Sequence, residues 1–481
     1  MSGGWLATPW ARPSALYSAP GSLILKLALG EAPDAVPAVQ DVRAGVYRAT
    51  TALGVGPVDR MLSRFSDRVR VTRLYGAAAA LGRPGRGHTA FDPLEHTTGL
   101  ARTFRVETGR DTAIGDMVDG LRQLGVVEAV SPRYLCVLPF AAPPAGSDEA
   151  WASRDRVHLA EAMAFEPGDP ACVVGLLDTG VAAGHRELRT HLRPGRDVVQ
   201  IASADLAAGI QLLGDYHGRD EDPDDELGHG TACAGIIAAA GLGLPPGLAG
   251  ACGLLPIRVL ATAQLPGRAT RVGLGALSDI DFGLKLAMDL GAKVLNMSFG
   301  TPMAELDPAD PVPHADVVRY GLARGCVLVA ASGNSGAEER FTPAALDGVI
   351  AVGAAGADGR PASFSTRGPH VALSAPGERV RTAGLQGDAL VTGTSFAAPF
   401  VAAAAALLVC RAARRAATLD GAAAGRLLRA SSVTWPAGTA AGHGAGVLDA
   451  WAALRALDRE LDQVVTDAPP GDVVQAGARG P

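Results

Sequence analysis

The stretch Val-Thr-Gly-Thr-Ser-Phe-Ala-Ala-Pro-Phe, residues 391–400, leads into an alanine-rich run, Ala397–Ala416, that predicts a helix. Ser395 stands where this helix begins, so its hydroxyl lies near the positive end of the helix dipole. Its backbone N–H is a first-turn donor without a helix acceptor and can point at an anion. Pro399 suits a first turn, which needs no N–H from it. The stretch therefore predicts a nucleophile beside half of an oxyanion hole, although an isolated Gly-Thr-Ser is more often an ordinary helix cap.

Length and composition are those of a soluble globular protein. The chain has 481 residues, of which 48% are hydrophobic and 19% charged, and this length allows two or three domains. A net charge of −6 gives no basic surface for nucleic acid or an anionic membrane. No apolar run approaches the roughly 20 residues of a membrane span. Neither nucleic acid nor a membrane span is expected.

The first thirty residues lack the order of a secretory signal, which needs a basic segment, then an apolar one, then a cleavage site. The first basic residue is Arg12, and Lys26 interrupts the apolar stretch Leu23–Leu29. A cytoplasmic location is expected, with secretion by another route left open.

Six cysteines stand singly, without a metal-ligand spacing such as C-x-x-C. Buried free thiols in a reducing compartment are therefore favoured over disulfides. The residues are Cys136, Cys172, Cys233, Cys252, Cys326 and Cys410.

Residues 22–138 predict a small α+β domain with the ferredoxin-like order β-α-β-β-α-β. Residues 1–21 before it are expected to be flexible, and Gly76–Gly99 within it is expected to be a surface loop. The expected elements are strands at Ser22–Leu29, Val69–Leu74 and Arg102–Glu107, helices at Val58–Phe65 and Thr112–Leu124, and paired strands at Val126–Val130 and Arg133–Leu138.

Residues 139–150 have the composition of a linker. Over 151–460, strands alternate with helices, which predicts an α/β fold with a mostly parallel sheet and helices on both faces. Functional loops should then sit at the carboxyl ends of the strands. The tail, 461–481, is polar and rich in glycine and proline, and it is expected to be disordered.

Three further polar residues stand at element boundaries in this region. Asp178 ends the apolar strand 173–177, where a carboxylate needs a partner to stay ionised. His229 opens a helix between two glycines, after six acidic residues in Asp220–Glu226 that are most simply a solvated loop. Asn334 follows the strand Val327–Ala331 and could donate to an oxyanion opposite Ser395. Singly, each could be a turn, loop or core residue.

Together, the order Asp, His, Ser matches a known arrangement of the nucleophilic triad. Here the chain resembles the subtilisin-like serine proteases over about 150–460. The motifs that carry this resemblance are Val-Val-Gly-Leu-Leu-Asp-Thr-Gly-Val (173–181), His-Gly-Thr-Ala-Cys-Ala-Gly (229–235), Leu-Asn-Met-Ser-Phe-Gly (295–300), Ala-Ser-Gly-Asn-Ser-Gly (331–336), Gly-Thr-Ser-Phe-Ala-Ala-Pro (393–399) and Gly-Ala-Gly-Val-Leu-Asp-Ala (444–450).

The resemblance implies a serine endopeptidase that acts on a peptide or protein. Ser395 would attack the carbonyl, His229 would move the proton and Asp178 would hold the imidazole. Asn334 and the Ser395 N–H would bind the oxyanion. The substrate cleft would be bordered by Ser298, Phe299, Gly300, Ser332, Gly333 and Ser335, whose mostly small side chains suggest a roomy pocket.

The resemblance also has implications for cofactors and for thiol chemistry. It implies that the reaction requires no cofactor. The carboxylate at the position of the family's calcium site is Glu187, within His-Arg-Glu-Leu (185–188) in place of the usual His-Pro-Asp-Leu, so structural calcium is left open. Cys233, four residues beyond His229, resembles the free cysteine of the proteinase K branch and implies inhibition by bulky thiol reagents.

The region 22–138 resembles the family's inhibitory propeptide, chiefly through its element order. The implied protein is a zymogen whose own N-terminal domain lies in the cleft, with self-cleavage near 138–150. A permanent regulatory or docking domain is the alternative, as in an intracellular protease dedicated to removing one leader. From another class, a pseudoprotease that only binds peptides also remains open.

Overall fold

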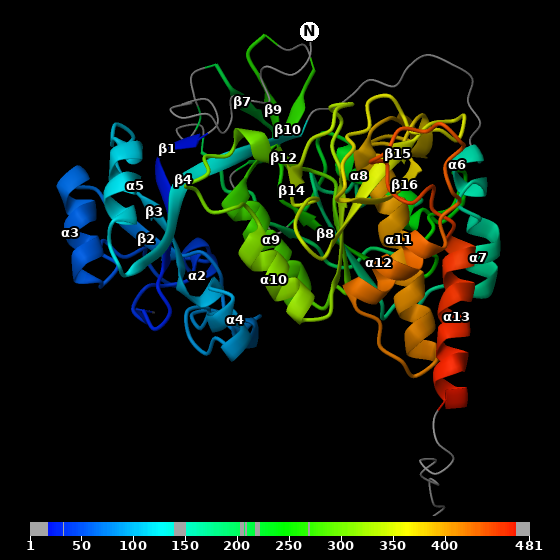
Figure 1. Ribbon diagram of the computed structural model, residues 1–481. Helices are drawn as coiled ribbons and strands as arrows, with labels where there is room; N and C mark the ends of the chain where they lie inside the picture. The colour runs from blue at the N-terminus through cyan, green and yellow to red at the C-terminus, as the bar shows by residue number, and fades with distance from the viewer. Residues whose placement is uncertain are drawn as a thin grey trace, which may run out of the picture.

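The computed structural model describes residues 18–31, 33–138, 151–202, 206, 209–216, 222–267 and 270–467. The N-terminal part lies beside a larger α/β part, and one long strand, β4, passes from the first toward the second (Figure 1). The ends 1–17 and 468–481 and the expected linker 139–150 lie outside the described residues.

A seven-stranded sheet forms the centre of the larger part, and all its pairings are parallel. Its strands are short apolar runs because helices cover both faces, which confirms the predicted class. In sheet order the strands are β16 (Val371–Pro376), β15 (Val349–Ala355), β13 (Val327–Ala331), β11 (Val294–Met297), β5 (Val173–Asp178), β8 (Gly253–Arg258) and β6 (Arg196–Asp197).

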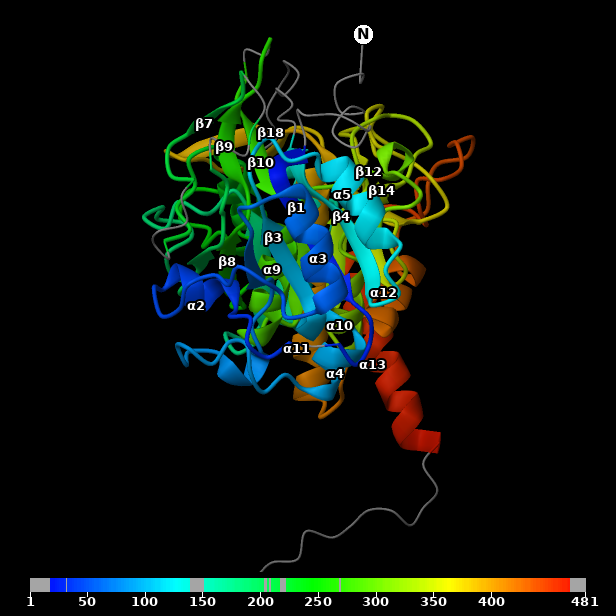
Figure 2. The same cartoon turned by 90° about the vertical axis from the view of Figure 1, so that its left-hand side faces the viewer.

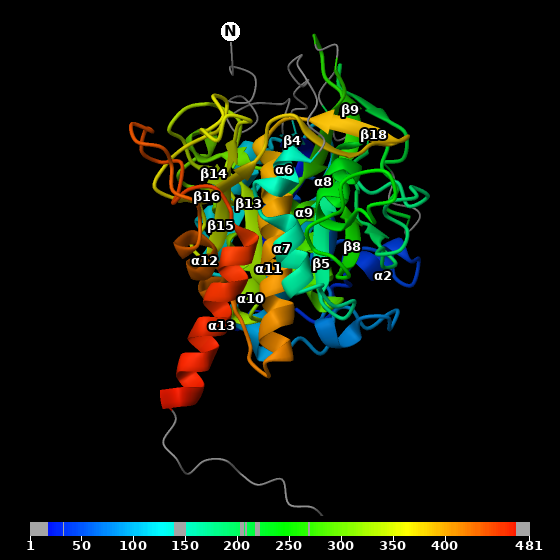
Figure 3. The ribbon, with the colours of Figure 1, turned by 90° about the vertical axis from the view of Figure 1, so that its right-hand side faces the viewer.

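Helices α9 (Leu277–Asp289) and α10 (Ala315–Ala323) pack on one face of this sheet. The other face is covered by α8 (His229–Ala238), α11 (Thr394–Arg414) and α12 (Gly421–Ala430), with α7 (Leu159–Phe165) and α13 (Ala450–Asp467) outside them (Figure 3).

Helix α11 is long and apolar enough to span a membrane by length and composition, but 83% of its most apolar window is buried in the fold. Its alanines lie in the main core, where small side chains let the helix approach the sheet closely. The helix begins at Thr394, so Pro399 lies inside it rather than in its first turn, contrary to the prediction.

The N-terminal part has the predicted order β-α-β-β-α-β, and its strands run β2-β3-β1-β4 across the sheet. Helices α3 and α5 cover the outer face, as Figure 2 shows, and α9 contacts β4 from the other side. The elements are β1 (Ser18–Leu27), α3 (Gly56–Phe65), β2 (Arg70–Arg73), β3 (Thr103–Glu107), α5 (Ile114–Arg122) and β4 (Val127–Leu138).

Four sequence expectations need correction. Strand β1 begins at Ser18, so residues 18–21 belong to it and not to the flexible N-terminus expected for 1–21. The paired strands expected at 126–138 are one strand, β4, whose first part pairs with β1 and whose last part pairs with β10 (Val272–Ala276). The expected loop 76–99 contains a short helix, α4 (Pro93–Thr97), whose capping box fixes the buried Glu95. Helix α13 continues to Asp467, beyond the expected start of the tail at 461.

The remaining elements are short. They are α2 (Val39–Arg43), α6 (Ala152–Asp155), β7 (Gln211–Leu213), β9 (Ala261–Gln264), β12 (Thr301–Pro302), β14 (Phe341–Thr342), β17 (Val380–Ala383) and β18 (Asp388–Val391). Strands β10, β9 and β7 extend the N-terminal sheet, so β4 joins the two parts of the molecule.

Candidate active site

The side chains of Asp178 and His229 meet at the carboxyl end of the central sheet. Asp178 is the last residue of β5, and His229 is the first of α8. The imidazole Nδ1 lies 2.7 Å from Asp178 Oδ1, and both side chains are almost fully buried. Gly228 before His229 has a φ of 96°, a conformation that a side chain would strain. An imidazole that donates through Nδ1 to a carboxylate presents Nε2 as its proton acceptor.

Ser395 lies in the first turn of α11, beside the segment that follows β11. Its hydroxyl donates to the Ser298 carbonyl at 3.1 Å. The Ser298 hydroxyl donates in return to the Ser395 carbonyl at 2.7 Å, and the Cys233 thiol reaches the same carbonyl at 3.4 Å. That carbonyl is available because Pro399, four residues on, has no N–H to bond it. The proline inside the helix thus lets two side chains fix the backbone of Ser395.

Asn334 follows β13 and is oriented by the residue before the serine. The Thr394 N–H and the Thr394 hydroxyl each donate to Asn334 Oδ1 at 2.9 Å. With its oxygen held twice, the amide presents Nδ2 as a donor on the side of Gly393. The Asn334 amide and the Ser395 N–H can both donate hydrogen bonds to an anion bound at the start of α11. Thr394 is a positioning residue that the sequence prediction did not include.

Asp225 joins the two loops that carry the buried Asp178–His229 pair. One carboxylate oxygen accepts from the Thr179 hydroxyl and the N–H groups of Leu227 and Gly228, and the other from the N–H and hydroxyl of Thr231. Burial raises the pKa of Asp225, and these hydrogen bonds lower it in part. The acidic stretch is therefore not simply a solvated loop, as the sequence suggested, because one of its carboxylates organises the site.

The predicted pocket residues lie together, but several of their side chains are buried in the core or make hydrogen bonds within the protein instead of facing a substrate. Phe299 is in the core, the Ser332 hydroxyl donates to the Thr366 carbonyl at 3.0 Å, and the Ser335 hydroxyl lies 2.9 Å from Thr366 Oγ1. The missing side chains of Gly300 and Gly333 would leave room in the pocket, but the side chain of Phe341 fills that room. A Cβ atom at Gly333 would lie 2.8 Å from the Phe341 ring. The expectation of a roomy pocket is wrong at this point, because β14 inserts an aromatic side chain.

The end of β4 lies between β10 and the segment at Gly300. Residues Leu135–Leu138 pair antiparallel with β10, and Leu138 lies close to Thr179 around Gly273. Burial raises the pKa of the Cys136 thiol to about 12, and hydrogen bonds with the Thr301 side chain and the Gly300 backbone oppose this rise. The strand therefore contacts β10 on one side and the segment at Gly300 on the other.

Glu187 does not offer a calcium site. Its two carboxylate oxygens accept from the N–H groups of Leu242 and Leu244, at 2.9 and 3.3 Å, and Arg186 lies 3.7 Å from one of them. Calcium needs several converging oxygen ligands, whereas here N–H donors and a guanidinium surround the carboxylate. Glu187 instead fixes the loop after α8, whose Ala240 N–H donates to the Glu187 carbonyl.

Comparisons with known proteins agree with this architecture. A family model described as the subtilase family matches residues 169–430, more than half of the 481 residues. A thermophilic serine proteinase of Bacillus sp. (strain AK1) is 36% identical over 237 residues, 49% of this chain and 51% of the relative. Thermitase of Thermoactinomyces vulgaris is 31% identical over 239 residues, 49% of this chain and 74% of the relative. The chain thus spans about half the length of the first relative.

Two solved structures are similar over longer stretches. A protease from Pseudoalteromonas arctica PAMC 21717 has a TM-score of 0.54 and 26% identity, and the match covers 66% of this chain and 100% of that one. An epidermin leader peptide processing serine protease from Staphylococcus aureus has a TM-score of 0.62 over 91% of this chain and 99% of that one, a likeness of fold at 16% identity. With the family model matching over half of its length, the chain belongs to the subtilase family.

Proposed function

We propose that this chain is a serine endopeptidase that hydrolyses peptide bonds through an acyl-enzyme. The observation that carries the proposal is the buried 2.7 Å contact between His229 Nδ1 and Asp178 Oδ1, on a chain whose serine motif begins α11 nearby. A carboxylate fixed on Nδ1 sets the imidazole tautomer, so that Nε2 can take a proton. Chemistry of this kind needs no cofactor.

In the proposed reaction, Ser395 Oγ attacks the scissile carbonyl carbon while His229 accepts the hydroxyl proton. Asp178 stabilises the imidazolium, which then protonates the leaving amine. Water attacks the resulting acyl-enzyme in the second half, and His229 again moves the proton. The Asn334 amide and the Ser395 N–H donate to the oxyanion. Without substrate, the Ser395 hydroxyl rests on the Ser298 carbonyl; catalytic hydrogen bonds are often absent until substrate binds.

The substrate is proposed to bind as an extended strand between β10 and the segment Ser298–Gly300. The support is the place of β4, whose last residues already pair with β10 and contact Gly300. A peptide that adds a strand here would gain backbone hydrogen bonds irrespective of its sequence. Phe341, against Gly300 and Gly333, favours a small side chain next to the scissile bond.

The N-terminal part is proposed to inhibit the enzyme until the chain is cut within 138–150. The proposal is supported by β4, which takes the path proposed for substrate and leads from Leu138 toward the expected linker. We call the 22–138 region propeptide-like on this ground, and we expect the chain to be made as a zymogen.

A second candidate is a processing protease that keeps its N-terminal part attached. Buried ion pairs across the contact between the two parts favour it: Lys285 pairs with Glu95 at 2.6 Å, and Arg133 donates to both Asp279 oxygens at 3.0 Å. Separation would expose these partners and break the pairs. A peptide-binding pseudoprotease is the least favoured candidate, because the buried pair and the amide donor are all present.

Intact mass with N-terminal sequencing tests these candidates, using the wild type beside Ser395→Ala. A zymogen predicts a wild type cut within 138–150 and an intact variant. An attached N-terminal part predicts that both stay whole while the wild type still reacts with a fluorophosphonate probe at Ser395. A pseudoprotease predicts neither cleavage nor labelling.

Cys233 is proposed to make the enzyme sensitive to mercurials, since its thiol contacts the Ser395 carbonyl. Desolvation and the nearby Asp178 raise its pKa well above the usual value, so we expect slow modification of the folded enzyme. Inactivation by a mercurial should disappear in Cys233→Ala, and equal sensitivity of this variant would contradict the proposal. A cytoplasmic location is also proposed, on the ground of six buried free thiols, and cell fractionation tests it.

A further inference from the structure

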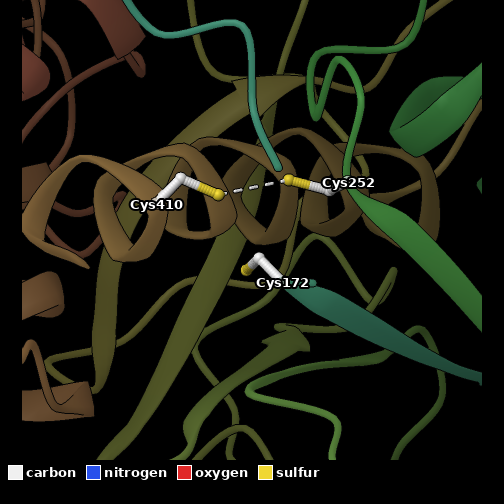
Figure 4. Close-up of side chains that lie close together, drawn as sticks. All are labelled: Cys172, Cys252 and Cys410. Atoms are coloured by element: carbon white, nitrogen blue, oxygen red, sulfur yellow. Dashed lines mark hydrogen bonds between the residues drawn. The ribbon is translucent and has the colours of Figure 1, made fainter. Parts of the chain in front are cut away.

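Three cysteines that are far apart in the sequence meet at the end of the sheet opposite His229. Cys172 precedes β5, Cys252 precedes β8, and Cys410 lies near the end of α11. Their three sulfur atoms all lie within 4.8 Å of one another, and the Cys252 and Cys410 sulfurs are 3.5 Å apart. Figure 4 shows these two side chains pointing toward each other, with the Cys172 sulfur beside the gap.

The cluster is enclosed. Cys252, Cys410 and Cys172 are 1%, 2% and 7% exposed. The Cys172 thiol also approaches the Ala406 carbonyl of α11 at 3.7 Å. Among the described residues, no histidine or carboxylate completes the group. The ligand set is therefore three sulfurs from three separate elements.

Three converging thiols suit a metal ion better than a disulfide. A disulfide uses two sulfurs at about 2.05 Å and would leave the third thiol over. A metal–sulfur bond of about 2.3 Å, as for zinc, separates the sulfurs around one ion by about 4 Å. The separation of 3.5 Å between the Cys252 and Cys410 sulfurs, and the placement of all three sulfurs within 4.8 Å of one another, are compatible with that value. Small side-chain rotations would centre an ion among them.

We propose that Cys172, Cys252 and Cys410 form a binding site for a soft metal ion, Cu(I). Thiolates select soft ions, Cu(I) among them, and Cu(I) accepts two or three ligands, whereas structural zinc takes four. The absence of a fourth side-chain ligand among the described residues therefore separates the two metals.

The binding step exchanges protons for the metal without a redox change. Each sulfur that forms a bond to Cu(I) loses its S–H proton to solvent or remains a neutral thiol ligand. Two thiolates and one thiol around Cu(I) leave one negative charge.

Occupation would tie the starts of β5 and β8 to the last turns of α11. Cys252 and Cys410 are 158 residues apart in sequence, and a crosslink that closes a long loop restricts the unfolded chain most. A metal that binds only the folded chain also stabilises it by mass action. The expected role is structural, away from the residues proposed for catalysis.

Titration of the full-length chain with Cu(I), in competition with a chromogenic Cu(I) chelator under anaerobic conditions, tests the proposal. A Ser395→Ala background prevents self-cleavage. The site variant carries Cys172→Ala, Cys252→Ala and Cys410→Ala, and the matched control carries Cys326→Ala, another buried cysteine outside the cluster. We expect one Cu(I) per chain in parent and control, at least hundredfold weaker binding in the site variant, and a copper-dependent rise in Tm only where the site is intact.

Several outcomes would overturn the proposal. One is equal copper binding by the parent and the site variant. Another is a chain purified without oxygen that is about 2 Da light and has Cys252 linked to Cys410. Preference of the three cysteines for Zn(II) over Cu(I) would overturn the choice of metal. If the triple variant does not fold, Cys410→Ser against Cys326→Ser decides by the same titration, since losing one of three ligands should weaken binding at least tenfold.

Discussion

The two ends of the central sheet carry two different kinds of cluster on the same elements. Strand β5 follows Cys172 and ends at Asp178, while α11 has Ser395 in its first turn and Cys410 near its last. At the carboxyl ends of the strands, hydrogen bonds of 2.6 to 2.9 Å fix Asp178, Asn334 and Asp225. At the amino ends, the Cys252 and Cys410 sulfurs lie 3.5 Å apart, and the Cys172 thiol lies 3.7 Å from the Ala406 carbonyl.

The two kinds of contact suit different functions. Charge-assisted hydrogen bonds are directional and short, so they hold a reacting group in one orientation. Thiol contacts are weak, so backbone placement alone brings the three sulfurs together, and they can adjust to an ion. The cluster at the carboxyl ends of the strands is organised for proton transfer, and the cluster at the amino ends is organised for metal binding.

The sharpest test of the comparison exchanges one residue at each end of α11. Ser395→Ala should lower kcat by about 10⁶, the loss known for the nucleophile of subtilisin, whereas Cys410→Ala should leave kcat unchanged. Hydrolysis of a chromogenic peptide by chains matched for folding measures both. A Cys410→Ala enzyme with strongly reduced kcat would show that the two ends are coupled.

Asn334→Ala should lower kcat by about 10²–10³ with little change in KM, because the amide acts on the oxyanion rather than on the bound substrate. Thr394→Val removes one of the two donors to Asn334 Oδ1 and should cost less. Thr382→Val, elsewhere in the core, is the control for hydroxyl loss. A rise in KM at constant kcat would place Asn334 in substrate binding instead.

Phe341→Ala should widen the substrate pocket between Gly300 and Gly333. The ratio of kcat/KM for a peptide with phenylalanine before the scissile bond to one with alanine should rise at least about tenfold, since even a methylene is worth that much in a pocket. Phe282→Ala on α9 controls for the loss of an aromatic ring. An unchanged ratio would mean that Phe341 does not border the pocket.

The smallest effect is expected from calcium removal. EDTA should not shift Tm through Glu187, because N–H donors already occupy its carboxylate. Glu187→Ala should instead lower stability by about 1–3 kcal/mol, the cost of leaving the buried Leu244 N–H without an acceptor. Thermal unfolding with and without EDTA measures both effects, with Glu338→Ala as an exposed control. A drop in Tm with EDTA that Glu187→Ala abolishes would contradict this account.

The features that could be predicted from the sequence are those encoded by residues adjacent to one another in the chain. The strand before Asp178 and the helix after His229 follow from apolar runs and flanking glycines, and the structure has both. Asp225 was missed because its hydrogen-bond partners come from two loops that only the fold brings together. Phe341 was missed because it lies outside the small-residue motif, and it enters the pocket from β14.

The three-cysteine cluster shows the same limit in another form. Cys172 and Cys252 are 80 residues apart, and Cys252 and Cys410 are 158 residues apart. Neither spacing matches a metal-ligand motif, so the sequence predicted unrelated core cysteines. The parallel sheet aligns the starts of β5 and β8, and α11 crosses beside them, which is information that the spacing does not contain.

The pairing of β4 with β10 also affects how the molecule associates with others. Without Leu135–Leu138, the backbone N–H and C=O groups of Val272–Ala276 would form an open sheet edge, a surface that recruits strands from other chains. The N-terminal part, besides any inhibitory role, keeps this edge closed. A released catalytic part would need a bound peptide to cover the same groups, so its solubility at high concentration would depend on whether a peptide fills the cleft.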